Sequence, residues 1–195
     1  MTSRSATVSR KTKETDITLT LDIDGSGTAE VATGIGFLDH KLATLTKHAR
    51  FDLTLTCQGD LHIDDHHTAE DCALALGAAL DEALGDRAGI GRFGSAYAPL
   101  DEALARAVID LSGRPYAYVS LGLHRERLGG LACENVGHVL RSLATAARAT
   151  LHVDLLRGEN DHHRAEAAFK ATALALRQAV HTGGGGDVPS TKGVL

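Results

Sequence analysis

The sequence is poor in aromatic residues and has no excess of positive charge. Its 195 residues include no tryptophan, four phenylalanines and three tyrosines. Lysine and arginine number 20 against 25 aspartates and glutamates, so the formal net charge is −5. A nucleic-acid surface needs a basic stripe and aromatic side chains on which bases can stack. We therefore expect no nucleic-acid partner.

Long apolar runs are absent as well. No segment approaches the roughly 18 consecutive apolar residues that a membrane-spanning helix requires. The first residues, MTSRSATVSRKTKETD, lack the apolar stretch of a signal peptide. The three cysteines, Cys57, Cys72 and Cys133, have no metal-ligand spacing and are typical of reduced thiols. These features predict a cytoplasmic protein that does not associate with membranes.

A repeated histidine motif stands out among the residues that are present. Asp-His-His-x-Ala-Glu occurs at residues 65–70 and again at residues 161–166. One further histidine precedes each copy at a nearly equal spacing, His40 before the first and His138 before the second. Such internal similarity indicates a duplicated unit. We interpret residues 1–195 as a single domain of two repeats, roughly 10–92 and 93–181, followed by a tail at 182–195.

Both repeats show the same order of secondary-structure signals. Alternating apolar residues and the turns between them predict strands near 16–23, 28–33, 51–57, 103–110, 115–121 and 150–156. Leucines and alanines at helical spacing predict a helix after the second strand of each repeat, and long helices near 67–84 and 163–180. This grouping predicts an α+β fold, with helices covering mainly antiparallel sheets.

The repeated motif points to bound metal ions. Residues four apart share a helix face, so His66 can converge with Glu70 and His162 with Glu166, although the three-residue spacing from His67 to Glu70 is also suitable. Adjacent helical residues point about 100° apart, so one ion does not suit both histidines of a pair. Two ions that divide each pair between them satisfy the geometry, and the upstream histidines would complete their ligand sets.

The predicted ligands are nitrogen and oxygen atoms without thiolate, which disfavours a structural zinc site. Manganese, iron(II), zinc and nickel all suit such ligands. Asp65 and Asp161 precede the histidine pairs and are expected to accept hydrogen bonds that orient imidazole rings. Arg114 and Lys170 could direct an anion-binding charge toward the metals. From the residues alone, the sequence indicates a dinuclear metalloprotein.

Several segments resemble the imidazoleglycerol-phosphate dehydratase family. They are Lys13-Glu14-Thr15, Gly36-Phe37-Leu38-Asp39-His40, both histidine motifs, Ser112-Gly113-Arg114-Pro115 and Pro189-Ser190-Thr191-Lys192-Gly193. The resemblance implies two four-stranded mixed sheets that enclose a four-helix bundle, with halves like the second domain of the fifth small-subunit ribosomal protein. It also implies two Mn(II) ions per active site and a 24-subunit shell with sites between subunits.

The resemblance further implies roles for individual residues. It places one ion on His66, His138, His162 and Glu166. It places the other ion on His40, His67, Glu70 and His163. Glu14 matches the family's general acid/base and would contact the substrate. The remaining expected substrate contacts, mostly to the phosphate, are His48, Arg92, Arg114, Lys170, Ser190 and Lys192.

The implied reaction removes water from imidazole glycerol phosphate and yields imidazole acetol phosphate. The proton that is lost is not next to a carbonyl group, so the imidazole ring must supply the electrons. Two metal ions on its nitrogens would stabilise the deprotonated ring, and Glu14 would move the proton at the neighbouring carbon. Two alternatives stay open: a dinuclear metallohydrolase whose ions activate water, and a non-catalytic protein whose ions join subunits.

Overall fold

The computed structural model describes residues 4–183 and 185–195 of the chain. Within those residues, two halves share one order of strands and helices, to which the second half adds a short two-stranded sheet, β8-β9, before its first helix. The first half contains β1 (Ser5–Lys11), β2 (Thr15–Asp22), β3 (Ala29–Ala32), α1 (Gly36–Ala49), β4 (Asp52–Gly59) and α2 (His66–Leu84). The second half contains β5 (Phe93–Leu100), β6 (Ala103–Asp110), β7 (Tyr116–Ser120), β8 (Arg127–Leu128), β9 (Leu131–Ala132), α3 (Cys133–Ala146), β10 (Thr150–Arg157) and α4 (Asp161–Val180).

Each half forms a four-stranded mixed sheet with the same topology. The strand orders are β1-β2-β4-β3 and β5-β6-β10-β7. In both sheets the first three strands pair antiparallel, and the last strand, β3 or β7, runs parallel to its neighbour. The predicted strands and helices are confirmed with bounds that differ by a few residues, and the α+β class is confirmed with them.

The edge strands β1 and β5 were not predicted from the residue pattern. In β1 only Ala6 and Val8 supply the apolar positions of the alternation, and only Ala6 is fully buried. β5 contains Gly94 and Pro99, residue types that are depleted in strands. These residue types leave a weak sequence signal at β1 and β5, whereas the other two edge strands, β3 and β7, were predicted.

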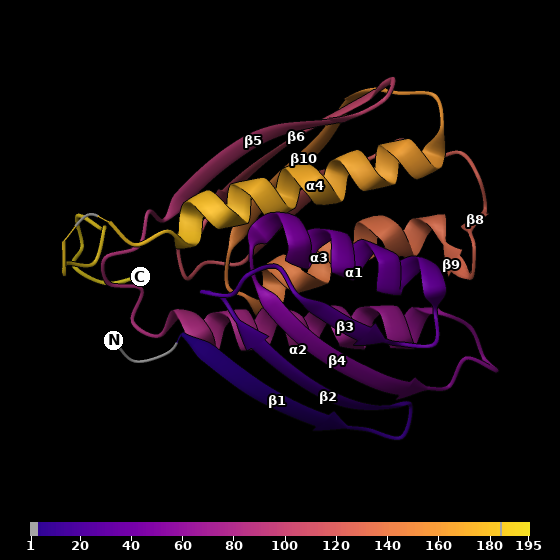
Figure 1. Cartoon of the computed structure of the whole chain (residues 1–195), viewed down its shortest axis with the longest axis horizontal. Coiled ribbons are helices and arrows are strands. Elements are labelled where there is room, and N and C mark those ends of the chain that lie inside the picture. Colours follow the sequence, from indigo (N-terminus) through magenta and orange to yellow (C-terminus); the bar gives the residue numbers. More distant parts are fainter. Residues whose placement is uncertain (1–3, 184) are drawn as a thin grey trace.

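The helices lie between the two sheets (Figure 1). α2 packs against β1, β2 and α3, and α4 packs against β5, β6 and α1. Two glycines permit the closest approaches. A Cβ atom at Gly77 of α2 would lie 2.4 Å from the Leu143 backbone oxygen of α3, and one at Gly94 of β5 would lie 1.9 Å from the Ala175 oxygen of α4. Small side chains therefore set the spacing of this helical layer.

The four helices run in the same direction, so their N-termini lie at one end of the helical layer and their C-termini at the other. All four helices begin at the same end, on the right of Figure 1, and the C-terminus lies at the opposite end. The motif histidines consequently gather where the helices start. Among the residues that the structure describes, no helix is long and apolar enough to cross a membrane. Cys57, Cys72 and Cys133 are free and buried, in agreement with the prediction of reduced thiols.

Candidate metal centre

Both histidine motifs start a helix in the same way. The Asp64 side chain accepts a hydrogen bond from the backbone N–H of His66 (2.8 Å), and the Asn160 side chain accepts one from His162 (2.9 Å). Aspartate and asparagine suit this position because their short side chains reach the unpaired N–H groups of the first turn. The local sequence thus places the first histidine of each pair at the start of a long, buried helix.

One group of ligand-type side chains consists of His66, Glu70 and His138, which we call the Glu70 cluster. The His138 Nε2 atom lies 3.0 Å from a Glu70 carboxylate oxygen, and the His66 Nε2 atom lies 3.8 Å from the other oxygen. The two imidazole rings stack with their centroids 4.9 Å apart. The predicted pairing of His66 with Glu70 across one helical turn is therefore present, and His138 joins it from α3.

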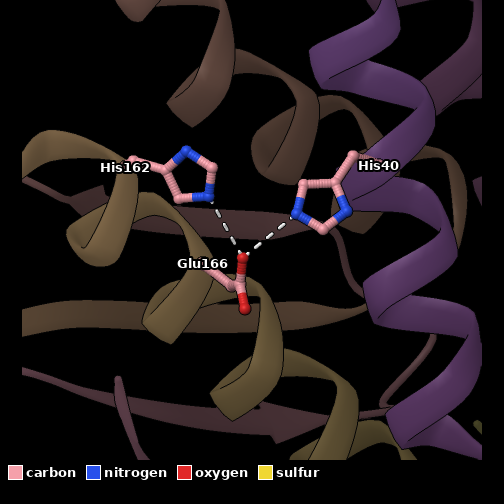
Figure 2. A group of neighbouring side chains, drawn as sticks. All are labelled: His40, His162 and Glu166. Atoms are coloured by element: carbon pink, nitrogen blue, oxygen red, sulfur yellow. Dashed lines mark hydrogen bonds and ion pairs between the residues drawn. The ribbon is translucent and has the colours of Figure 1, made fainter. Parts of the chain in front are cut away.

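The second group consists of His40, His162 and Glu166, which we call the Glu166 cluster (Figure 2). The Nε2 atoms of His40 and His162 lie 3.2 and 3.3 Å from the same carboxylate oxygen, Oε2 of Glu166. His162 and Glu166 come from one turn of α4, and His40 comes from α1. In each cluster, one ligand atom per residue lies within 4.8 Å of the other two.

The second histidine of each pair points to a different set of carboxylates. His67 contacts Asp60 through Nδ1 (3.0 Å), and its Nε2 atom lies 3.8 Å from Glu14. His163 contacts Glu102 through Nδ1 (2.7 Å), with Asp101 3.8 Å from its Nε2 atom. Glu14 lies in the β1–β2 turn, and Asp101 and Glu102 occupy the matching β5–β6 turn. In each half, the turn between the first two strands thus brings a carboxylate to Nε2 of the second histidine, whereas the Nδ1 partner comes from different places, Asp60 after β4 and Glu102 in the β5–β6 turn.

The residues that orient the first histidines differ from those expected. Asp65 contacts no imidazole; it accepts hydrogen bonds from Arg127, from the Ala132 backbone and from the side-chain amide of Asn135. The Asn135 amide oxygen lies 2.9 Å from Nδ1 of His66. Because an amide oxygen only accepts hydrogen bonds, Nδ1 carries the proton, and Nε2 is left with its lone pair toward Glu70. Asp65 therefore acts on His66 only through Asn135.

Asp161 is likewise buried without an imidazole partner. Its carboxylate accepts hydrogen bonds from the backbone N–H groups of His124 and Arg125 and contacts Arg164. These bonds hold the β7–β8 connection against the start of α4. The expectation that Asp65 and Asp161 bind imidazole rings directly is therefore wrong, because both carboxylates already accept hydrogen bonds from backbone N–H groups and side chains of residues 124–135, and Asp161 also contacts Arg164.

Two lysines distinguish Glu166 from Glu70. The Lys41 Nζ atom lies 2.8 Å from Oε2 of Glu166, and the Lys170 Nζ atom lies 2.8 Å from Oε1. Burial alone would raise the pKa of Glu166, but the hydrogen bonds from Lys170 and Lys41 outweigh it and hold the pKa well below its ordinary value. Glu166 is thus ionised, and two ammonium groups already neutralise its charge.

The same environment affects two neighbouring histidines. Burial, and next the charge of Lys41, lower the pKa of His162. Burial, and next the charge of Lys170, lower the pKa of His48, a predicted substrate contact on α1. In the first pair the effect is opposite, because the hydrogen bond to Asp60 raises the pKa of His67. A neutral imidazole is the form that binds metal; the surroundings of His162 favour this form, and those of His67 disfavour it.

The predicted phosphate contacts lie mostly at the other end of the helical layer. The Arg92 backbone N–H donates to the Ala179 carbonyl near the end of α4, and its guanidinium donates to Asp110 and to the Pro189 carbonyl. Arg114 has an exposed side chain 3.9 Å from Asp110. Ser190 and Lys192 follow Pro189 in the tail, and a hydrogen bond links them. Lys170 alone lies beside a histidine cluster.

Several residues around the clusters were missed from the sequence. Lys41 could have been noticed in the sequence, because it lies at helical spacing in the apolar stripe of α1, between Leu38 and Leu45. In the structure its side chain is fully buried. Asn135 and Glu102 carried no such signal, because polar residues in a helix or a turn are ordinarily exposed. Only the folded chain brings them against histidines distant in sequence.

The arrangement is chemically suited to divalent metal ions. Each cluster supplies two imidazole nitrogens and one carboxylate oxygen converging on one point, without any thiolate. Asn135 fixes the ring nitrogen that is free to bind, as outer hydrogen bonds do in metal sites. Histidine and carboxylate ligands of this kind suit manganese, iron(II), zinc and nickel.

Comparisons with known proteins agree on one family. A family profile described as imidazoleglycerol-phosphate dehydratase matches residues 33–176. An imidazoleglycerol-phosphate dehydratase of Phytophthora nicotianae is 60% identical over 98% of this chain, which spans 42% of that protein. One from Maudiozyma humilis is 53% identical, and each chain is covered completely. The crystal structure of the Staphylococcus aureus imidazoleglycerol-phosphate dehydratase superposes with a TM-score of 0.83 at 36% identity, covering 92% of this chain and 99% of that one.

Proposed function

The chain belongs to the imidazoleglycerol-phosphate dehydratase family, whose members are hydro-lyases of histidine biosynthesis, and we propose that its activity depends on two metal ions held by the histidine–glutamate clusters. It converts imidazole glycerol phosphate to imidazole acetol phosphate and water. The observation that supports the metal proposal is the pair of converging ligand sets, each with two imidazoles and a carboxylate. We propose Mn(II) as the resident ion and the cytoplasm as the location.

The ligand partition implied by family resemblance combines residues of both clusters on each ion. Within one chain, His66 and His138 accompany Glu70, whereas His162 and Glu166 accompany His40. The implied partition therefore requires the Glu70 cluster of one copy to face the Glu166 cluster of another. His67 and His163 would then be the additional imidazoles from adjacent positions on each helix.

A second argument for shared sites comes from the length of α4. This helix has 20 residues and is therefore about 30 Å long. His162 lies at its start, and Arg92 is hydrogen-bonded to its last turn. A substrate with three carbons between ring and phosphate cannot reach from one end to the other. We propose that neighbouring subunits supply the phosphate contacts of each site, as in a 24-subunit shell.

The chain's own residues can account for substrate binding and proton movement. The guanidinium groups of Arg92 and Arg114 can grip phosphate oxygens, because planar N–H groups match them in pairs. Bound metal ions would act as Lewis acids toward the imidazole ring. Glu14 has an exposed carboxylate 3.8 Å from His67, and it can hold or release a proton beside a ring bound there. The matching topology of the halves also supports an origin by internal duplication.

The Glu14→Gln variant tests this function. It keeps the size of the side chain but removes the acid/base, so turnover should fall by about 10²–10⁴-fold, the usual contribution of such a group. Metal content should stay at the wild-type value. The control is Glu30→Gln, an exposed glutamate on β3 of the same sheet, which should leave both quantities unchanged. Turnover of Glu14→Gln equal to that of the wild type would refute the assignment.

A further inference from the structure

We propose that Lys41 is a built-in counter-cation of Glu166, so that the metal ion that uses Glu166 binds more weakly, and loads later, than the ion that uses Glu70. This inference rests on the metal proposal above and concerns the difference between the two sites. It applies whether the remaining ligands of each ion come from one copy of the chain or from two.

Lys41 cannot turn away into solvent. Its side chain is fully buried, with 0% of its surface exposed, and its ammonium group lies 5.0 Å from the centre of the Phe37 ring. A lysine ammonium is strongly hydrated in water, so it occupies a buried position only with a strong partner. Here that partner is the Oε2 atom of Glu166 at 2.8 Å.

The same oxygen is the one that a metal would use. Oε2 of Glu166 faces the Nε2 atoms of His40 and His162, whereas Oε1 faces Lys170. A cation that binds Oε2 must share this atom with the Lys41 ammonium or displace the ammonium. It also meets the positive charge of that ammonium at close range in a partly buried site, where charges are poorly screened.

Within the described residues, no lysine or arginine forms an ion pair with the Glu70 cluster. Val139 follows His138 as Lys41 follows His40, and Leu74 follows Glu70 by four residues as Lys170 follows Glu166. In the part of the chain that the structure describes, the ion pairs of Glu70 involve only His66 and His138. An incoming cation therefore meets one carboxylate that has only imidazole neighbours and another that is already paired with two ammonium groups.

Metal titration of the full-length, metal-stripped protein tests the inference. Mn(II) is added, and the free ion is counted by its electron paramagnetic resonance signal, which requires no turnover. The wild type should show two affinity classes. Lys41→Met should tighten the weaker class by at least about tenfold, since even a partly screened unit charge at this range is worth that much. The stronger class should not change.

Four further variants make the assignment specific. Glu70→Gln should remove the stronger class and Glu166→Gln the weaker one. Lys47→Met, which removes an exposed lysine of the same helix, should match the wild type. Lys41→Gln removes the charge with a polar side chain and should behave as Lys41→Met does. Far-UV circular dichroism and native mass verify that each variant folds and assembles.

The possible outcomes separate this inference from the proposed function. If the wild type binds no Mn(II), the metal proposal fails and this inference fails with it. If the wild type binds two ions in one affinity class, or loads the Glu166 ion first, the inference alone is refuted, and this comparison needs no Lys41 variant. Unchanged or weaker binding by a folded Lys41→Met or Lys41→Gln protein also refutes it, because Lys41 would then support the ligand rather than compete for it.

Discussion

The Glu70 and Glu166 clusters contain the same ligand types but have different surroundings. Each takes a histidine and a glutamate from one turn of a long helix and a second histidine from a shorter helix. Glu166 is bound by Lys41 and Lys170, whereas Glu70 meets only imidazoles within the described residues. Two clusters with the same ligand types can thus differ in net charge, because different residues contact their carboxylates.

A second difference concerns how the first histidine of each motif is held. Asn135 precedes His138 by three residues and binds the His66 ring by a hydrogen bond. Phe37 precedes His40 by three residues and contacts the His162 ring edge-on, with centroids 5.3 Å apart. A polar contact fixes which ring nitrogen is protonated, and an aromatic contact fixes only the ring's orientation. Corresponding positions of the two halves therefore do related tasks by different chemistry.

Removal of a motif histidine should have the largest effect on metal content among the variants that test this comparison. His66→Ala and His162→Ala each delete one imidazole ligand, so each variant should retain about one ion where the wild type holds two. Elemental analysis after exhaustive dialysis measures the content. His152→Ala, on the β10 strand away from both clusters, is the control. Full occupancy in both ligand variants would contradict the ligand assignment.

Loss of Asn135 should have an intermediate effect that is confined to one half. Asn135→Ala frees the His66 ring to adopt the wrong protonated nitrogen, and loss of such a partner typically weakens metal binding by about 10–100-fold. Only the ion that binds His66 should be affected. Phe37→Leu, the matched change in the other half, should weaken the ion that binds His162 by a smaller factor. Isothermal titration calorimetry compares the two; equal losses would remove the distinction drawn above.

The smallest expected difference is between the pKa values of His67 and His162 in the metal-free protein. The hydrogen bond to Asp60 raises the pKa of His67 above 6.5, and burial followed by the Lys41 charge lowers that of His162 below 6.5. His67 therefore contributes stability below pH 6.5 that is lost as pH rises through its raised pKa. His162 has the opposite sign: its contribution is present above pH 6.5 and is lost as pH falls.

Nuclear magnetic resonance titration of the imidazole protons measures this difference directly. Asp60→Asn should return the pKa of His67 toward its ordinary value and leave His162 unchanged. Lys41→Met should raise the pKa of His162 and leave His67 unchanged. Titration of the two histidines at the same pH in the metal-free protein would show that their surroundings do not differ as the structure indicates.

Local sequence patterns account for much of the fold. The alternation in residues 16–23 and 103–110 predicted β2 and β6, because half-buried strands expose every second side chain. Helical spacing predicted α2 and α4 to within two residues at each end. The strands β1, β5, β8 and β9 escaped prediction, because β1 and β5 show little apolar alternation and β8 and β9 have two residues each. The close packing at Gly77 and Gly94 was equally invisible, because a glycine does not reveal its partner.

By itself, the sequence determined which atoms could bind metal and in what pairs. The His-x-x-x-Glu spacing dictates convergence on any helix, so His66 with Glu70 and His162 with Glu166 followed from helical geometry alone. Only the tertiary structure decided which third histidine joins each pair, that Lys41 is buried against one carboxylate, and that Asn135 orients one ring. Those contacts join segments far apart in the chain, and their distances depend on how two sheets and four helices pack, which no local pattern encodes.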